Sequence, residues 1–295
     1  MALISLKNDH FYAEISTTGA ALKLLQFQGR DLIESAPKVP RYHGSVLAPW
    51  PNRIRDGRYV FRGTTYTTVI NEVDRNNALH GLVDKVEFSI QSQGDGNLHL
   101  SAIVASGNHY PSDLRIDCFF SLDPAGLYWK ISAENIGNSA APYGVSIHPY
   151  LVTGTDLLVD ELYLSFESKE FLEVDDQRLL PLELQHVDSR DFNFNNKTRI
   201  GTRFIDHAFK LNPLSDNRRI ELTDSKGVGT FMEYDSAAKW IQIHTADREG
   251  GADSRKCLAV EPMSCPPDAF NSGLDLIDLE PGQTFTMSWL IGPIN

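Results

Sequence analysis

The sequence predicts an all-β protein built as one large antiparallel β-sandwich. Apolar and polar residues alternate with a period of two in many separate segments. Turn-forming Gly, Pro, Asp and Asn residues interrupt these segments at short intervals, which suggests about 15 to 20 strands. Helical periodicity is weak, and we expect at most a turn or two near residues 188–192 and 201–204.

The clearest predicted hairpin covers residues 114–134. One face of its first strand carries Leu114, Ile116, Cys118, Phe120 and Leu122. An Asp-Pro-Ala-Gly turn follows, and apolar residues alternate again in the second strand. The same pattern predicts hairpins at residues 59–70, 86–106 and 219–234 and a last strand with Phe285, Met287, Trp289 and Ile291 on one face. Residues 170–203 show the least regular pattern, and we expect long surface loops there.

The composition is that of an ordinary globular protein. The chain has 295 residues, 41% of them hydrophobic and 22% charged. No Gly/Ser/Pro-rich linker or charge run divides it, so we expect a single domain over residues 1–295. The formal charge of -12 disfavours nucleic acid and anionic membranes as partners, because both require clustered basic residues. A small neutral molecule is the better expectation.

Targeting signals and cysteine chemistry are not indicated. The first residues read as a strand, not as a signal peptide, and no apolar run reaches the roughly 18 residues of a membrane span. Three cysteines without a CxxC pair suggest neither a disulfide framework nor a zinc knuckle. We therefore expect a reduced, cytoplasmic setting.

The segment YGVSIHPY, residues 143–150, places a histidine where a strand should stop. Pro149 has no backbone N–H and favours extended geometry in the residue before it. His148 should therefore face a cleft or a rim, and imidazole exchanges protons near neutral pH. The alternative is a structural histidine, hydrogen-bonded at a sheet edge.

A second strand resembles the first. The apolar run LAVEP ends in Glu261 before Pro262, so we expect this strand, too, to stop at its proline. The alternative is a solvated carboxylate at the rim. Together, His148 and Glu261 could form an acid and base pair.

Three further places carry polar residues in apolar surroundings. Asn52 and Arg53 in WPNRI could line a walled cleft, or the arginine could lie along an edge strand. His80 in ALHGL could be presented by a tight loop, or could be exposed in a turn. Asp206 in IDHAF must be paired or bind a ligand if it points inward, or it forms a salt bridge on an exposed face.

Motifs for other chemistries are absent from the sequence. None of the nine histidines forms an HxH or HExxH arrangement, so we expect no metal. The sequence has no GxSxG, no P-loop and no GxGxxG after a strand. Of the chemistries considered, acid and base catalysis by side chains remains.

At these residues the sequence resembles the aldose 1-epimerases, or galactose mutarotases, over nearly its whole length. The resemblance rests on five motifs in one order: APWPNRI with GRYVFRG and Asn71, then ALHGL, SIHPYL, IDHAFKL, and AVEPMSCPPDAFN ahead of LEPGQTF. It implies a galactose mutarotase-like supersandwich that binds a pyranose. It also implies a general base at Glu261 and a general acid at His148. His80, Arg53 and Asp206 match positions that hold sugar hydroxyls and support the acid.

The implied reaction interconverts the α and β anomers of a free sugar and needs neither metal nor cofactor. The base takes the C1 hydroxyl proton while the acid protonates the ring oxygen, and the open chain rotates and recloses. For this, we expect Glu261 to rest ionised and His148 to rest protonated.

The sugar and the competing functions stay open. Galactose-acting members usually have Gly-Arg before the Asn-Arg-Ile run and a longer HGG, which this chain lacks. Arg53, Arg55, Arg58 and Arg62 lie close in sequence, so an acidic, sulfonated or phosphorylated sugar is one alternative. A non-catalytic sugar-binding sandwich and a glycosidase using Asp206 and Glu261 are others. The sequence does not determine the oligomeric state.

Overall fold

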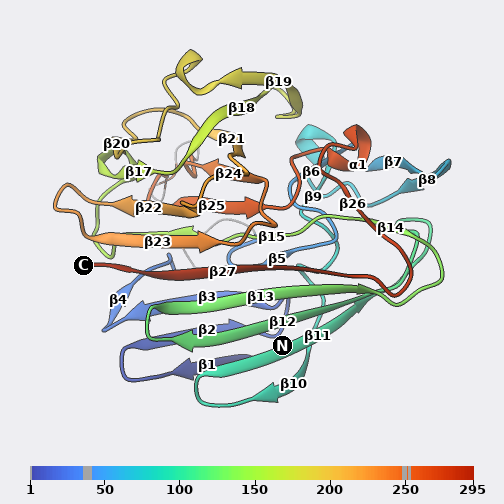
Figure 1. Ribbon diagram of the computed structural model, residues 1–295, viewed down its shortest axis with the longest axis horizontal. Coiled ribbons are helices and arrows are strands. Elements are labelled where there is room, and N and C mark those ends of the chain that lie inside the picture. The colour runs from blue at the N-terminus through green and yellow to red at the C-terminus, as the bar shows by residue number, and fades with distance from the viewer. Residues whose placement is uncertain (1, 36–41, 248–250, 252–253) are drawn as a thin grey trace.

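The protein is almost entirely β-structure, as the sequence predicts. The computed structural model describes residues 2–35, 42–247, 251 and 254–295. Strands of the two largest sheets pair antiparallel. In Figure 1 the β18–β19 hairpin stands at the top of the molecule and the β7–β8 hairpin projects at the right.

The described strands form three larger sheets and four short pairs. The nine-stranded sheet has the order β10 (Ser89–Gln93), β11 (Asn97–Val104), β12 (Leu114–Asp123), β13 (Gly126–Asn135), β27 (Thr284–Ile294), β23 (Gly229–Tyr234), β22 (Arg219–Thr223), β17 (Tyr163–Ser165) and β20 (Thr198–Arg199). The six-stranded sheet has the order β16 (Tyr150–Leu151), β25 (Leu258–Met263), β24 (Trp240–His244), β21 (Asp206–Leu211), β18 (Ser168–Val174) and β19 (Pro181–His186). The four-stranded sheet contains β1 (Leu3–Lys7), β2 (Phe11–Ser16), β3 (Ala21–Phe27) and β4 (Arg30–Asp31).

The short pairs and helices connect these sheets. The pairs are β5 (Val46–Leu47) with β15 (Ser146–Ile147), β6 (Arg53–Arg55) with β9 (Asn77–Leu79), β7 (Arg58–Phe61) with β8 (Thr64–Thr67), and β14 (Ala141–Tyr143) with β26 (Ile277–Leu279). The described helices are α1 (Ala269–Ser272) and the 3-10 turns Val73–Arg75, Val159–Glu161 and Val187–Ser189. None of them is long and apolar enough to cross a membrane.

The predicted hairpins are confirmed. Strands β12 and β13 pair in register from Leu114 opposite Asn135 to Asp123 opposite Gly126. Alternate residues of β12 are buried, which shows that its apolar face packs into the core. The other predicted hairpins are β7–β8, β10–β11 and β22–β23, and the predicted last strand is β27.

The expectation of long loops over residues 170–203 is wrong. This segment completes β18 and contains β19 and β20. Strand β19 is an edge strand without a buried residue, and the alternation of Leu182 and Leu184 with Glu183 and Gln185 is too short to distinguish it from a loop. One predicted helical turn overlaps the 3-10 turn Val187–Ser189, while residues 201–204 form no helix.

The two proline-containing strands differ from each other. Strand β15 ends at Ile147, so His148 lies in the gap before β16, as predicted. Strand β25, however, continues through Glu261 and Pro262 to Met263. The Pro262 carbonyl accepts bonds from Ser146 and Trp289, so Pro262 faces away from β24 and its missing N–H leaves that ladder intact.

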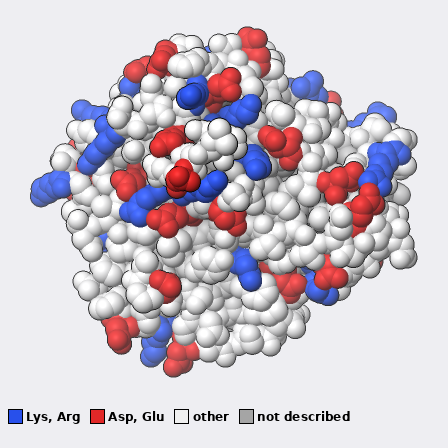
Figure 2. Space-filling model, viewed as in Figure 1, with Lys and Arg blue, Asp and Glu red and all other residues white. Residues whose placement is uncertain are grey.

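Charged side chains are mixed over the surface. On the face in Figure 2, acidic and basic side chains are interspersed and no broad area of one sign is visible. Part of this mixing comes from exposed ion pairs such as Arg62 with Asp278 and Glu280.

Gly81 should not tolerate a side chain. It has φ +78, and a Cβ would lie 2.1 Å from the Ala48 carbonyl oxygen. Gly63 has a similar φ of +80 but open space around it. We expect Gly81→Ala to lower the free energy of unfolding by roughly 3 kcal/mol or more, against about 1 kcal/mol for Gly63→Ala. Urea unfolding measures both, and equal losses would contradict the close approach to Ala48.

Candidate active site

One cavity collects all six polar residues that the sequence singled out. It has a volume of about 400 Å³ and is lined by Asn52, Arg53, His80, His148, Asp206 and Glu261. Strands β21 and β25 supply the two carboxylates, and the loops that follow β15 and β9 supply the histidines. A larger hollow of about 760 Å³ beside Arg30 has no unpaired buried polar side-chain atom among its described residues.

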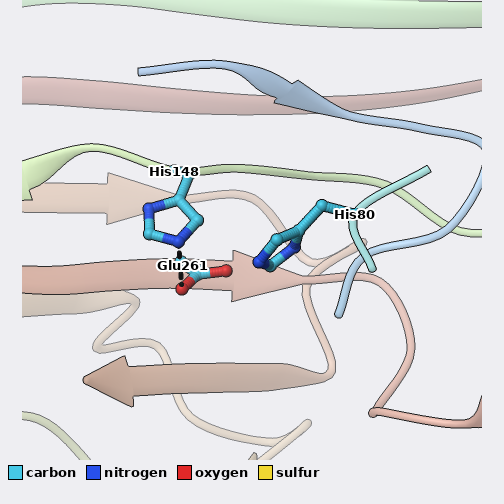
Figure 3. Close-up of side chains that lie close together, drawn as sticks. All are labelled: His80, His148 and Glu261. Carbon is cyan, nitrogen blue, oxygen red and sulfur yellow. Dashed lines mark ion pairs between the residues drawn. The ribbon is translucent and has the colours of Figure 1, made fainter. Parts of the chain in front are cut away.

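His148 and Glu261 form the buried centre of the cavity. Their side chains face each other in Figure 3, with His148 Nε2 3.2 Å from Glu261 Oε1. His148 is 5% exposed and Glu261 is 2% exposed. His148 Nδ1 and Glu261 Oε2 have no hydrogen-bond partner among the described protein atoms. Both side chains therefore keep an atom that a ligand could satisfy.

Burial reverses the expected resting charges of this pair. Desolvation, followed by the nearby charge of Asp206, raises the pKa of Glu261 well above its ordinary value. Desolvation, followed by the proximity of His244, lowers the pKa of His148 to about 3. Both pKa shifts run opposite to the expectation of an ionised Glu261 beside a protonated His148, because two isolated charges are costly at this depth.

His80 is presented by a tight turn, the first of its two alternatives, and its tautomer is determined by the backbone. His80 has φ +64 and precedes Gly81. Its Nδ1 accepts the Asn52 N–H at 3.2 Å, so Nδ1 carries no proton. Burial lowers the pKa of His80 well below its ordinary value, which leaves a neutral ring with a proton on Nε2. This nitrogen can donate to a ligand oxygen.

That tautomer argues against a metal. Within the described part of the chain, His80, His148 and Glu261 are the group whose ligand atoms lie close enough, within 4.8 Å of one another, to share an ion. Metal ligation needs a free lone pair, and His80 Nδ1 already uses its lone pair for the Asn52 N–H. The protonated Nε2 suits a hydroxyl or ether oxygen better.

Arg53 is held between two carboxylates. Its Nε and Nη2 donate to Glu72 at 2.9 and 3.0 Å, and Nη2 lies 3.6 Å from Asp206 Oδ2. Burial alone would lower the pKa of Arg53, but the charges of Asp206 and Glu72 outweigh it and raise that pKa. Burial likewise opposes ionisation of Asp206, yet Arg53 keeps the pKa of Asp206 below its ordinary value. Asp206 is thus paired, as an inward carboxylate requires.

Asn52 orients the arginine from the adjacent position. It has φ +56 and is 3% exposed. Its Oδ1 accepts the Arg53 backbone N–H at 3.0 Å and lies 3.4 Å from Arg53 Nη1. The local pairing of β6 with β9 brings Asn52 beside His80, whose N–H donates to the Asn52 carbonyl.

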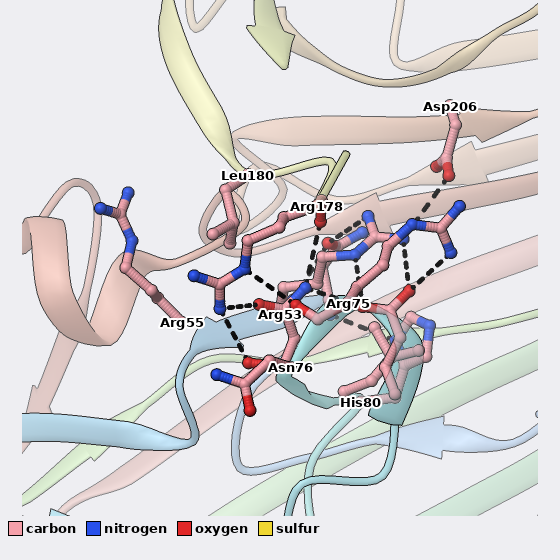
Figure 4. Close-up of polar contacts among 12 residues, drawn as sticks. Arg53, Arg55, Arg75, Asn76, His80, Arg178, Leu180 and Asp206 are labelled. Carbon is pink, nitrogen blue, oxygen red and sulfur yellow. Dashed lines mark hydrogen bonds and ion pairs between the residues drawn. The ribbon is translucent and has the colours of Figure 1, made fainter. Parts of the chain in front are cut away.

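Two turns are clamped together at the mouth of the cavity (Figure 4). Arg178 donates to the carbonyls of Arg75 and Asn76 and to the Asn77 side chain, at 2.8 to 3.1 Å. Asn77 in turn donates to Glu72 at 2.9 Å. Leu179, the next residue, has φ +53 and lines the cavity. The clamp therefore connects the β18–β19 turn to the carboxylate that holds Arg53.

The cluster of arginines in the sequence does not converge on the cavity. Of its four members, only Arg53 lines the described cavity. Arg55 pairs with Asp268, Arg62 pairs with Asp278 and Glu280, and Arg58 is exposed.

Sequence reasoning missed Glu72, Arg178 and His244. Glu72 and Arg178 stand in irregular segments with no local signal, because their partners are distant in sequence. His244 did have a signal. Gln242 and His244 alternate with Ile241 and Ile243, which places two polar groups on one face of a buried strand.

Comparison with known proteins identifies what this arrangement resembles. A family model described as "Aldose 1-epimerase" matches residues 2–291. The uncharacterized protein YihR of Escherichia coli K12 is 37% identical over 284 residues, which cover 95% of this chain and 89% of that protein. The uncharacterized protein YphB of the same organism is 28% identical over 248 residues, covering 81% of this chain and 80% of that protein.

Solved structures share the fold at low sequence identity. An aldose epimerase homologue from C. elegans has a TM-score of 0.85 at 20% identity and covers 100% of this chain and 99% of its own. Galactose 1-epimerase from Lactobacillus acidophilus NCFM has a TM-score of 0.81 at 20% identity and covers 99% of this chain and 95% of its own. The galactose mutarotase-like architecture is thereby confirmed.

The Glu72 carboxylate should contribute strongly to stability. Glu72→Gln removes the charge that compensates the buried Arg53 and places an amide beside guanidinium donors. We expect a loss of about 3 kcal/mol in the free energy of unfolding, measured with urea. Arg75→Gln removes an exposed partner of the same carboxylate, 3.2 Å away, and should cost no more than about 1 kcal/mol. Equal losses for Glu72→Gln and Arg75→Gln would show that the pairing of Glu72 with Arg53 is not its main contribution to stability.

Acid should destabilise the protein through buried histidines. Burial, followed by the nearby charge of Lys23, lowers the pKa of His43 to about 4. The unfolded chain then binds the extra proton first, so this stability is complete above pH 6.5 and decreases as the pH falls toward 4. We expect His43→Gln to reduce the difference in unfolding free energy between pH 8 and pH 5 by roughly 2 kcal/mol. An unchanged pH dependence would show that His43 is not kept neutral by folding.

Proposed function

Because this chain belongs to the aldose 1-epimerase family, we propose that it interconverts the α and β anomers of a free aldopyranose by ring opening and reclosure. The main support is the buried pair of His148 and Glu261, 3.2 Å apart in a cavity lined by hydrogen-bonding groups. One group can take a proton while the other gives one, as ring opening requires. We assign Glu261 as the base and His148 as the acid.

The proposed reaction moves protons and one C–O bond. The Glu261 carboxylate takes the C1 hydroxyl proton, a C1 carbonyl forms, and the bond from C1 to the ring oxygen breaks. His148 gives its proton to that ring oxygen, so the open-chain aldehyde leaves a protonated Glu261 and a neutral His148. After rotation about C1–C2, the same transfers run backward to close the ring. The pair ends with the protons it began with.

Burial assists the opening step in this scheme. The pair holds one transferable proton, and burial favours the form with neutral His148 and protonated Glu261. A shift of this proton across the 3.2 Å contact produces the charged, reactive form. Ring opening then returns the pair to its uncharged form. The free energy needed to form the charged pair is recovered in this step, so the pair itself adds no net cost to the open-chain aldehyde.

The other groups of the cavity hold the sugar. His80 Nε2 and the Arg53 guanidinium offer donors, and the carboxylate of Asp206 and the carbonyl of Asn52 offer acceptors. Arg53 and Asp206 are already bound to protein partners, so their positions are fixed before a sugar arrives. Fixed donors and acceptors orient the anomeric carbon toward Glu261.

Two variants test the assignment by polarimetry on freshly dissolved α-glucose and α-galactose. We expect Glu261→Gln and His148→Asn each to reduce the enzymatic rate by roughly 10² to 10⁴, because each removes one proton-transfer group. His186→Asn, at an exposed position outside the cavity, should match the wild type. A variant of Glu261 or His148 that folds and keeps the full rate would be excluded from the mechanism.

A panel of sugars separates the proposal from its rivals. Neutral aldoses, uronic acids, a sulfonated aldose and aldose 6-phosphates identify the substrate class through their rates. Binding of a sugar without acceleration of mutarotation would favour a non-catalytic sugar-binding protein. Release of nitrophenol from a nitrophenyl glycoside would favour a glycosidase that uses Asp206 and Glu261.

A further inference from the structure

His244 is a pocket residue that the proposed reaction does not use. It is the last residue of β24 and lines the cavity together with His148, Asp206 and Glu261. In the six-stranded sheet it lies opposite Asp206 of β21 on one side and Ala259 of β25 on the other.

The imidazole of His244 has unused hydrogen-bonding capacity. Its Nδ1 is buried and finds no hydrogen-bond partner within the described part of the chain. A neutral imidazole has one donor and one acceptor, and a buried polar atom left unpaired costs free energy. The same strand carries Gln242, whose Nε2 donates to Asp206 Oδ1 at 2.6 Å. Gln242 thus supports Asp206, while His244 stays free to bind a ligand.

The position of Asp206 supplies the second half of the argument. Directly opposed residues of antiparallel strands have their Cβ atoms about 4.5 to 5.5 Å apart. Asp206 Oδ2 contacts Arg53 only at 3.6 Å, so this oxygen retains capacity to accept a further hydrogen bond. A carboxylate and an imidazole at this spacing can bind two hydroxyls on neighbouring carbons of one ring.

We propose that His244 is a sugar-binding residue that, with Asp206, forms a subsite for a vicinal diol of the aldose. The subsite rests on the proposed mutarotase function, since the sugar is then the ligand. It makes His244 a determinant of specificity. Sugars that lack one hydroxyl of this diol, or carry it in the other configuration, lose the contact.

The test combines His244 variants with deoxy sugars. For the best aldose found by polarimetry, we expect His244→Ala to lower kcat/KM about tenfold. His244→Asn keeps a short polar group near the position of Nδ1 and should restore part of the loss. Among the 2-, 3-, 4- and 6-deoxy analogues, the two that lack one hydroxyl of the diol should be poor substrates for the wild type. For the analogue that lacks the hydroxyl bound by His244, His244→Ala should change kcat/KM by less than twofold, because the contact is already missing.

Several outcomes would overturn the subsite. One is an unchanged kcat/KM in His244→Ala. Another is a loss in His244→Ala that is equally large for the parent aldose and for every deoxy analogue, which would indicate a structural role only. Thermal unfolding verifies that the variants are folded.

Binding separates this inference from the proposed function. If the wild type accelerates no sugar, the mutarotase proposal fails, and calorimetry then compares sugar affinities of the wild type and His244→Ala. Weaker binding by the variant supports the diol subsite, whereas equal binding, or no binding by either protein, overturns it.

Discussion

The cost of burying charge governs this site. Glu261 and His148 are almost fully removed from water, and Asp206 adds a second carboxylate to the same cavity. Two ionised carboxylates so close together would repel each other where solvent screens little. Arg53 compensates only part of this, because it also neutralises Glu72. Burial and Asp206 therefore both raise the pKa of Glu261, and its titration is coupled to that of His148 beside it.

The remaining polar contacts maintain the difference in pKa between the carboxylates of Asp206 and Glu261. Asp206 stays ionised because Arg53 is positioned by Glu72 and Asn52. Glu72 is in turn held by Asn77, which Arg178 ties to the neighbouring turn. A guanidinium at this depth stabilises the fold only when its partners have good geometry. The contacts that Arg178 and Asn77 make around Glu72 thus influence the protonation of Asp206 and Glu261.

Local sequence patterns were sufficient to find six polar residues that line the cavity, but not His244 or the contacts that hold these residues. Asn52, His80 and Asp206 stand out because a polar residue interrupts an apolar strand or precedes a glycine. Their supports, such as Glu72 and Arg178, depend on contacts between distant segments. The proline argument shows the same limit. It placed His148 correctly but ended β25 too early, because the effect of a proline depends on which neighbour its missing N–H would face.

The distribution of paired and unpaired atoms divides the cavity into a fixed part and a part that is open to a ligand. Arg53, Asn52 and Asp206 are engaged with protein partners, so they form a fixed frame. Among the described residues that line the cavity, the buried unpaired atoms lie on His148, Glu261 and His244, where a ligand could supply the missing bonds. Mutarotation requires C1 to turn over while the other carbons stay in place. For the proposed reaction, a rigid frame beside a proton-transfer pair would meet both requirements without movement of the backbone.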